Sequence, residues 1–291
     1  MMAELFKILQ PLQFIQTILN SGKRADGRKF DESRHVLISC DCVTSANGSA
    51  LIKFGTSSVI CGITTSLVKP TTIKPDEGII EIDVRFSNTG SNELENPDRT
   101  TISGYVRECV RKILSHSKCI NLKQLCLIPR KYCWKIMLEI ICLNMDGSIV
   151  DLSLLASLVA LKQCNLRKYE IDNEFDLITM TNEFEKINIR TYPMLCTFVI
   201  IDKHLLIDPT MNEEELSNSI IRMAIDPDQP SDSDCIYLLE ATGSCTIDEN
   251  LLKNIHMKTM KRAKFLRSVM IKYTEKQQNN DDDCQFETMQ L

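Results

Sequence analysis

The sequence predicts an α+β fold with two pseudo-related halves, in which mixed sheets pack against helices. The order of elements along the 291 residues is the main observation: strands, a helix, a strand and a helix are followed by further strands and a closing helix. The composition, with 43% apolar and 25% charged residues, is that of a globular chain with one large domain or two smaller ones. No sequence repeat is strong enough to prove an internal duplication.

Residues 1–28 are predicted to form a helix followed by an entry turn. Pro11 suits the first turn of a helix, and Asp26-Gly27 is typical of a turn. The apolar positions between them recur at helical spacing and are Leu12, Ile15 and Leu19. The first twenty residues are apolar enough to suggest a signal peptide, but polar residues interrupt them and no small-residue cleavage site follows. No stretch approaches the length of a membrane span, so no membrane partner is expected.

Residues 29–190 are predicted to form the first half. The strand candidates are Val36–Val43, Ser49–Phe54, Ser58–Val68, Ile79–Phe86 and Trp134–Leu143, and Asn47-Gly48 is typical of a hairpin turn between the first two. Arg99–Ser115 has the pattern of an amphipathic helix, and Leu152–Gln163 that of a buried helix with Asp151 as its N-cap. The stretch Phe175–Arg190 favours neither state.

Residues 191–276 are predicted to form the second half. Its strand candidates are Thr197–Ile207, which is long enough for a strand pair, Ser219–Ile225 and Cys235–Glu240. A long helix, Glu249–Glu275, closes the fold with an apolar stripe and many basic residues on its other faces. Residues 277–291 contain three consecutive Asp and are predicted to be a disordered acidic tail.

Charge and cysteine usage exclude several classes of site. The net charge of −5 provides no global field to attract nucleic acid, so any RNA contact must come from a local patch or from partner chains. The 13 cysteines contain no CxxC spacing and the four histidines are scattered, so neither a zinc site nor a catalytic triad is predicted. Cysteines placed within apolar runs favour a reducing compartment. We expect no metal and no cofactor.

Several motifs, taken in order, resemble the RNase PH family and in particular the inactive ring subunits of the eukaryotic exosome. The match runs from about residue 5 to residue 275. Its motifs are Arg24–Arg28, Gly48–Gly55, Ser58–Gly62, Leu143–Gly147 leading into Asp151–Leu161, and Asp208–Thr210 followed by Glu213–Glu215. Each motif is weak alone, and the ordered set is specific. Phe6-Lys7 and Gln10–Leu12 narrow the resemblance to one type of ring subunit.

The resemblance implies an RNase PH-like fold and a structural role in RNA processing and degradation, including rRNA processing and mRNA turnover. The implied partners are other RNase PH-like subunits in a hexameric ring, S1-type cap subunits and an associated hydrolytic nuclease. Single-stranded RNA would thread the pore of the assembled ring. The implied location is the nucleus, the nucleolus and the cytoplasm.

The resemblance also implies that the chain is catalytically silent. Phosphorolysis needs charge-assisted donors for a phosphate dianion and a pair of carboxylates. Active family members have Gly-Thr-Arg where this chain has Ser148, Ile149 and Val150, so the arginine is missing. Glu214 stands near the first of two family aspartates, and the second position falls near Ile220, which is apolar. An active phosphorolytic exoribonuclease and a stand-alone RNA-binding module remain the alternatives.

The acidic stretch Asp208–Glu215 is the densest carboxylate cluster in this part of the chain. It suits either a metal site or an Asp-Pro turn followed by the first turn of a helix, where carboxylates favour the backbone donors. The second interpretation is favoured. Asp146 and Asp151 could form a carboxylate pair. The favoured interpretation is that Asp146 belongs to a turn and Asp151 is a helix cap. The entry motif Arg24–Arg28 could contact RNA, and the favoured interpretation is an ion-paired turn.

Basic residues on the first long helix and its entry are candidates for an RNA path. They are Arg99, Arg107, Arg111 and Lys112. A solvated helix face explains the same residues equally well, and the preceding loop, Ser87–Pro97, lacks Arg. The basic residues of the closing helix are interpreted as a solvated outer face, with an acidic partner surface or RNA as the alternative.

Overall fold

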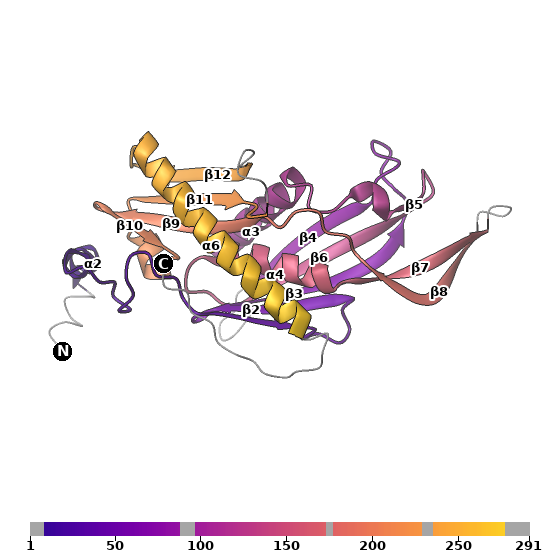
Figure 1. The fold of residues 1–291 in the computed structure, drawn as a ribbon, viewed down its shortest axis with the longest axis horizontal. Helices are drawn as coiled ribbons and strands as arrows, with labels where there is room; N and C mark the ends of the chain where they lie inside the picture. Colours follow the sequence, from indigo (N-terminus) through magenta and orange to yellow (C-terminus); the bar gives the residue numbers. More distant parts are fainter. Residues whose placement is uncertain (1–8, 88–96, 173–176, 229–234, 277–291) are drawn as a thin grey trace.

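The computed structural model describes residues 9–87, 97–172, 177–228 and 235–276, and it has two sheets packed with helices (Figure 1). The first sheet has six strands in the order β1-β2-β3-β6-β4, with β5 paired to β6. Its strands are β1 Val36–Cys40, β2 Gly48–Phe54, β3 Ser57–Val68, β4 Ile79–Phe86, β5 Cys126–Ile128 and β6 Tyr132–Asn144. The sheet is mixed, because β4 runs parallel to β6 and the other pairs are antiparallel.

The second sheet is antiparallel, with the order β10-β9-β11-β12. Its strands are β9 Met194–Ile201, β10 His204–Ile207, β11 Ser219–Ile225 and β12 Ile236–Gly243. Every residue of β9 is buried, as expected for a central strand. The α+β class with mixed sheets is confirmed, although the six-stranded and four-stranded sheets differ in strand order.

Helices join the two sheets into one hydrophobic core. They are α3 Pro97–His116, α4 Ile149–Gln163, α5 Met211–Glu215 and α6 Glu249–Lys276, with a short 3₁₀ turn, η2, at Leu122–Leu125. Helix α4 is buried almost all round and contacts β2 and β3 of one sheet and β9 of the other. In Figure 1, α6 runs diagonally across the second sheet towards β2 and β3.

Two smaller elements lie at the ends of the molecule in Figure 1. Helix α2, Pro11–Asn20, buries Ile15 and Leu19 in a separate small cluster with Val199, Ile201 and Leu206 of the second sheet. At the other end, β7 Asn165–Asp172 and β8 Leu177–Lys186 form a two-stranded ribbon. None of the described helices is long and apolar enough to cross a membrane.

The structure corrects several sequence-based expectations. Helix α4 begins at Ile149 with Ser148 as N-cap, so Asp151 lies inside its first turn and is not the cap. Gly48 is the first residue of β2, so Asn47-Gly48 is not a two-residue hairpin turn. Leu12 is 41% exposed and does not share the buried face of α2. The predicted acidic tail falls outside the described residues, and the four domain bounds stay predictions.

Candidate functional site

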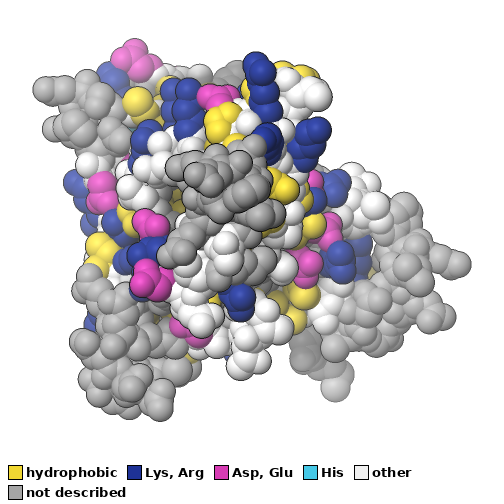
Figure 2. Space-filling model, turned by 90° about the vertical axis from the view of Figure 1, so that its right-hand side faces the viewer, with side chains coloured by type: hydrophobic (Ala, Val, Ile, Leu, Met, Phe, Trp, Pro, Cys, Tyr) yellow, Lys and Arg dark blue, Asp and Glu magenta, His cyan; other side chains and the backbone are white. Residues whose placement is uncertain are grey.

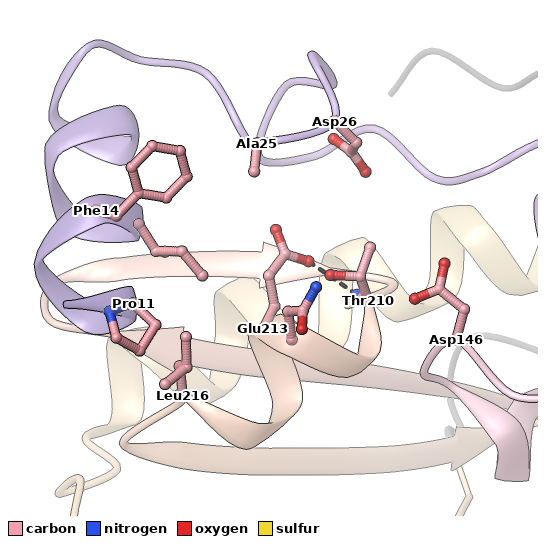
Figure 3. Close-up of a pocket in the computed structure, with 10 residues that line it drawn as sticks. Pro11, Phe14, Ala25, Asp26, Asp146, Thr210, Glu213 and Leu216 are labelled. Carbon is pink, nitrogen blue, oxygen red and sulfur yellow. Dashed lines mark hydrogen bonds between the residues drawn. The ribbon is translucent and has the colours of Figure 1, made fainter. Parts of the chain in front are cut away.

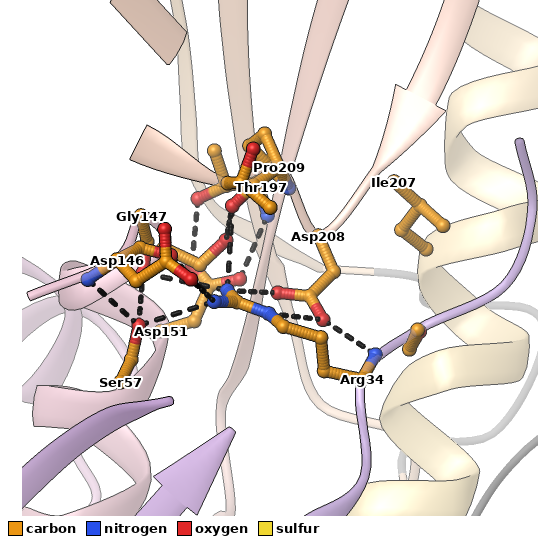
Figure 4. Close-up of polar contacts among 12 residues, drawn as sticks. Arg34, Ser57, Asp146, Gly147, Asp151, Thr197, Ile207, Asp208 and Pro209 are labelled. Carbon is orange, nitrogen blue, oxygen red and sulfur yellow. Dashed lines mark hydrogen bonds and ion pairs between the residues drawn. The ribbon is translucent and has the colours of Figure 1, made fainter. Parts of the chain in front are cut away.

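The acidic stretch begins with Asp208, which is fully buried among arginines. Figure 4 shows its carboxylate against Arg34. Its Oδ2 accepts the backbone N–H of Arg34 at 2.7 Å, and its Oδ1 accepts Nη2 of the same arginine at 2.7 Å. Nη1 of Arg28 lies 3.4 Å from Oδ2, and Nη2 of Arg262 lies 3.6 Å from Oδ1. Although burial opposes ionisation, Arg262, Arg34 and Arg28 hold the pKa of Asp208 well below its ordinary value. Asp208 is therefore a buried anion in an ion cluster.

Glu213 provides a second buried anion for the entry turn. Its Oε1 accepts Nε of Arg24 at 2.9 Å, and the other guanidinium nitrogens of Arg24 reach the carbonyl oxygens of Ile207 at 2.7 Å and Asp208 at 3.0 Å. Glu213 also accepts the backbone N–H of Thr210 at 2.8 Å and completes a capping box for α5. The interpretation of the acidic stretch as a turn and helix start is confirmed, and the entry motif is an ion-paired turn.

Sequence reasoning missed two members of this ion cluster. Arg34 has no motif of its own, and it bridges Asp208 to the 146–147 turn by donating to the carbonyl oxygen of Asp146. Arg262 was interpreted as part of a solvated helix face, which is wrong, because it is 1% exposed and points at Asp208 and the ring of Phe54. The rest of the basic face of α6 is mostly exposed, including Lys253, Lys261 and Lys264.

The 146–147 turn is pressed against the acidic stretch. The Oγ of Ser57 accepts the N–H of Asp146 at 3.0 Å and donates to the carbonyl oxygen of Gly147 at 3.1 Å. Gly147 has a φ of +78°, and a Cβ at this position would lie 2.3 Å from the carbonyl oxygen of Pro209. Only glycine allows both this backbone conformation and this close approach.

The first turn of α4 lies directly beyond this contact. The N–H of Ser148 donates to Oε1 of Glu214 at 2.7 Å, and the Ser148 hydroxyl donates to the carbonyl oxygen of Pro209 at 3.3 Å. Ser148 is 1% exposed, Ile149 8% and Val150 2%. Burial raises the pKa of Glu214, against the hydrogen bond from Ser148 and the positive charges of Arg222 and Arg34. The entry to α4 is thus closed by the protein's own carboxylate.

Asp151 links α4 to the second sheet. Its Oδ2 accepts the N–H of Thr197 at 2.9 Å, and its Oδ1 accepts the Thr197 hydroxyl at 2.6 Å. Burial raises the pKa of Asp151 to about 6. Asp146 instead accepts the Thr56 hydroxyl at 2.5 Å, so the two aspartates serve different partners and do not form a carboxylate pair. No group of three metal-ligating side chains occurs among the described residues.

A hollow of about 730 Å³ lies between α2, the entry turn and α5 (Figure 3). Pro11 and Phe14 line its apolar side, and Asp26, Asp146 and Glu213 line its polar side. Asp26 pairs with Arg28 at 2.6 Å, Glu213 with Arg24, and Asp146 with Thr56. Each of these three carboxylates therefore has a partner within the protein.

The four candidates for an RNA path lie on α3. Nε and Nη2 of Arg111 bind both oxygens of Glu108 at 2.8 and 2.7 Å, and Lys112 lies 3.9 Å from the same carboxylate. Arg107 is exposed, and Arg99 is half-buried near the start of the helix. On the face in Figure 2, Lys and Arg side chains are interleaved with Asp and Glu. The RNA path through these four residues stays a prediction.

Comparison with known proteins gives the family. Residues 32–167 match the model of 3′ exoribonuclease family domain 1 (RNase PH), and residues 191–262 match the model of domain 2. Exosome complex component rrp43 of Schizosaccharomyces pombe is 30% identical, over 76% of this chain and 82% of that protein. The chain belongs to the RNase PH family of 3′ exoribonucleases. Its sequence resemblance to ribosomal RNA-processing protein 43, also called exosome component 8, agrees with this relative.

Further members of the RNase PH family support the same fold. Exosome complex component Rrp42 of Methanopyrus kandleri is 27% identical, over 71% of this chain and 77% of that protein. A chain of a solved archaeal exosome core superposes with a TM-score of 0.74 at 24% identity, covering 92% of this chain and 98% of that one. A chain of the Archaeoglobus fulgidus exosome with RNA bound to the active site superposes with a TM-score of 0.74 at 25% identity. The match covers 88% of this chain and 96% of that one.

The five positions that the family resemblance marks as degenerate do not all come together. Ser148, Ile149, Val150 and Glu214 gather at the first turn of α4. Ile220 lies on β11, where it packs, partly buried, against the small cluster that holds α2. Two residues further on, Arg222 donates to the Tyr105 hydroxyl at 2.9 Å and joins α3 to the second sheet.

Proposed function

We propose that this chain is a non-catalytic structural subunit of an exosome core ring, which supports 3′–5′ RNA processing and degradation by shaping the pore that RNA threads. Family membership and the names of the relatives support the assembly. The similarity to a chain of the Archaeoglobus fulgidus exosome with RNA bound to the active site supports RNA as the substrate of the complex. The similarity to the S. pombe relative supports the eukaryotic, rRNA-processing type of subunit.

One observation carries the non-catalytic part of the proposal. The N–H of Ser148, at the entry to α4, is bound to Glu214 at 2.7 Å, and the two following side chains are the apolar Ile149 and Val150. A helix N-terminus attracts a dianion because its backbone donors are unsatisfied. Here an internal carboxylate uses that donor and adds negative charge, and the turn's own residues, 147–150, include no arginine to bind an incoming phosphate.

The missing second acid is the other support. With Ile220 at that position, no second carboxylate is available there to hold a metal or to act as an acid on the leaving oxygen. Glu214 is the remaining acid, and its backbone contact to Ser148 holds it in a structural role. Restoring phosphorolysis therefore requires changes at several buried positions at once.

The partners follow from the ring proposal. We place the chain next to other RNase PH-like subunits, with S1-type cap subunits on one face of the ring and a separate hydrolytic nuclease that receives the RNA. The proposed locations are the nucleus, the nucleolus and the cytoplasm. The division into residues 29–190 and 191–276 as two halves belongs to the same proposal.

Affinity purification of the full chain from cells tests the assembly. We expect RNase PH-like subunits to co-purify in stable amounts, and a stable monomer without exosome subunits would contradict the proposal. A second assay measures phosphate-dependent release of nucleoside diphosphates from RNA by the purified chain and its dimer. No release from folded protein is expected, and phosphate-dependent release would favour the active exoribonuclease.

A further inference from the structure

A hollow of about 490 Å³ lies between the C-terminal end of α3, β4 and the turns that follow α3. Basic side chains from separate segments line it, and they are Lys74, Arg111, Lys118, Lys123 and Arg190. Glu77 is the single carboxylate among its described lining residues. The lining therefore carries a net charge of +4, five cations against one anion, in a chain whose total charge is −5.

The next hollow along α3 has the opposite balance. It measures about 440 Å³ and shares Arg111 with the first. There Arg85, Arg107 and Arg111 face four carboxylates, those of Glu81, Asp83, Glu108 and Glu139. The positive charge of this surface is thus concentrated at the C-terminal end of α3, away from Arg99 and Arg107 among the four candidates that the sequence indicated.

Two of the five cations are available for a ligand. Lys74 pairs with Glu77 at 2.8 Å, Lys123 with Asp76 at 3.4 Å and Arg111 with Glu108 at 2.7 Å. Lys118 and Arg190 are exposed, and no described carboxylate lies within 4.0 Å of either charge. Neither residue is part of a sequence motif, and 72 positions separate them in the chain.

Backbone contacts fix these two residues relative to one another. The N–H of Arg190 donates to the carbonyl oxygen of Cys119 at 2.8 Å, and the Thr191 hydroxyl donates to that of Ser117 at 2.9 Å. An isolated β-bridge joins Ile120 to Ile189. The two cations are therefore presented from a braced pair of segments, which lowers the entropy lost on binding.

The floor of the hollow is apolar, with Ile80, Ile82, Leu114 and Leu122. Its volume lies within the range of about 300–1,000 Å³ that is usual for small-ligand sites. An apolar floor beneath a cationic rim suits a nucleotide, whose base packs on the floor while its phosphate meets the rim. An acidic peptide would use the rim and leave the floor unoccupied.

We propose that this hollow is an RNA-binding subsite, in which Lys118 and Arg190 contact the phosphodiester backbone of single-stranded RNA and one base packs over Ile80 and Leu122. The choice of RNA as the polyanion rests on the proposed function. The subsite extends the RNA path beyond Arg111 to residues that only the fold brings together.

The test uses the assembled complex, purified through the full-length chain. The probe is a single-stranded oligoribonucleotide carrying 4-thiouridine, which is crosslinked by light and mapped by mass spectrometry. We expect crosslinks in peptides from residues 117–123 or 187–191. The double substitution Lys118→Ala with Arg190→Ala is expected to remove them and to reduce the salt slope of RNA affinity by about 1.4, at about 0.7 for each phosphate contact.

The matched control is Lys253→Ala with Lys264→Ala, which removes the same charge from exposed positions of α6 and is expected to leave the crosslinks unchanged. An intact complex whose crosslinks avoid the hollow, or persist in the Lys118/Arg190 variant, would overturn the subsite. In a parallel sample treated with a protein–protein crosslinker, a link from an acidic neighbour into the hollow would also overturn it. Failure of the complex to form in the wild type would instead count against the ring proposal.

Discussion

At the residue scale, the buried carboxylate of Asp208 joins several segments of the chain. Asp208 binds Arg34, which lies just before β1, and its Oδ1 is 3.6 Å from Nη2 of Arg262 on α6. The segments that carry these charges are far apart in sequence, so the ion cluster fixes how the entry segment, the 146–147 turn and α6 meet. Taking one charge away leaves the others buried and uncompensated.

Asp208→Asn is therefore expected to destabilise the fold by about 3–5 kcal/mol, the usual cost of breaking a buried ion pair. Chemical denaturation of the purified chain measures it. Asp202→Asn is the matched control, because Asp202 has a φ of 56°, close to the 51° of Asp208, and is exposed. It is expected to change stability by less than about 0.5 kcal/mol. Equal losses at the two sites would show that backbone conformation, and not the ion cluster, sets the cost.

Asp151 is expected to make the free energy of unfolding depend on pH with the opposite sign from a carboxylate held in an ion pair. Its pKa of about 6 in the folded protein exceeds its ordinary value of 3.8, so the folded state binds the proton more tightly than the unfolded state does. The cost of burying this charge is present above about pH 6 and decreases as the pH falls towards 4. The free energy of unfolding of the wild type, relative to Asp151→Asn, is expected to increase between about pH 7.5 and 5.

Urea titrations of both proteins at several pH values measure this difference. A difference that stays constant with pH would mean that Asp151 remains charged through the whole range. Asp208 does not interfere, because its pKa is held well below 3.8 and its contribution is lost only at more acidic pH.

The sequence identified some of these residues and not others for a physical reason. Arg24 and Glu213 belong to motifs that are local in sequence, and the ion-paired turn and the helix start were predicted, but the contact between them was not. Arg262 lies on the amphipathic helix α6. The sequence of such a helix does not distinguish a buried arginine from a solvent-exposed one, because long cationic side chains occur on its buried and on its exposed faces. Lys118 and Arg190 are separated by 72 positions in the chain, so only tertiary structure places them together.

At the element scale, the first turn of α4 is where two loops meet at backbone contact. Gly147 precedes this turn, and the 209–211 backbone lies so close that any side chain would collide with it. The contact positions Glu214 against the N–H of Ser148. The contact between Glu214 and the first turn of α4 therefore depends on this glycine.

Gly147→Ala is expected to destabilise the fold by about 2–5 kcal/mol, because a left-handed alanine costs about 1–2 kcal/mol and overpacking against the backbone adds about 1–3 kcal/mol. Gly22→Ala is the control, since Gly22 also has a positive φ, +82°, but its Cβ would meet nothing within 4 Å. It is expected to show the conformational cost alone. Thermal and chemical unfolding compare the two, and similar losses would contradict a steric role for Gly147.

Elements with a strong local pattern were the ones that the sequence located best. The predicted bounds of β4 and β11 match the structure residue for residue, because Gly78 and Ser87 flank β4 and β11 is a largely apolar run. The start of α4 was missed because Ser148, its N-cap, has a φ of 52° and makes no side-chain cap. Strand β7 was missed because Asn165–Asp172 is largely polar and pairs only within a ribbon.

At the scale of the whole molecule, the two sheets present edges that fit a role in assembly. In the described part of the chain, β12 ends the second sheet and β4 ends the first. Exposed edge strands are templates for pairing with another chain, and monomeric proteins usually protect them. On β12, Ile236 is 42% exposed and Leu239 is 46% exposed, which is unfavourable for an isolated chain and suited to a ring subunit.

Leu239→Lys is therefore expected to reduce co-purification of RNase PH-like subunits while leaving the chain folded. A lysine on an edge strand opposes pairing, and it would place a charge in an interface that buries apolar surface. Quantitative mass spectrometry of the affinity-purified chain measures partner recovery, and circular dichroism checks the fold. Met257→Lys is the control, because Met257 is 64% exposed on α6 and the substitution adds the same charge away from the edge. Recovery of partners at the wild-type level by Leu239→Lys would exclude β12 from the ring contact, and an equal loss in both variants would indicate that added charge alone disturbs the assembly.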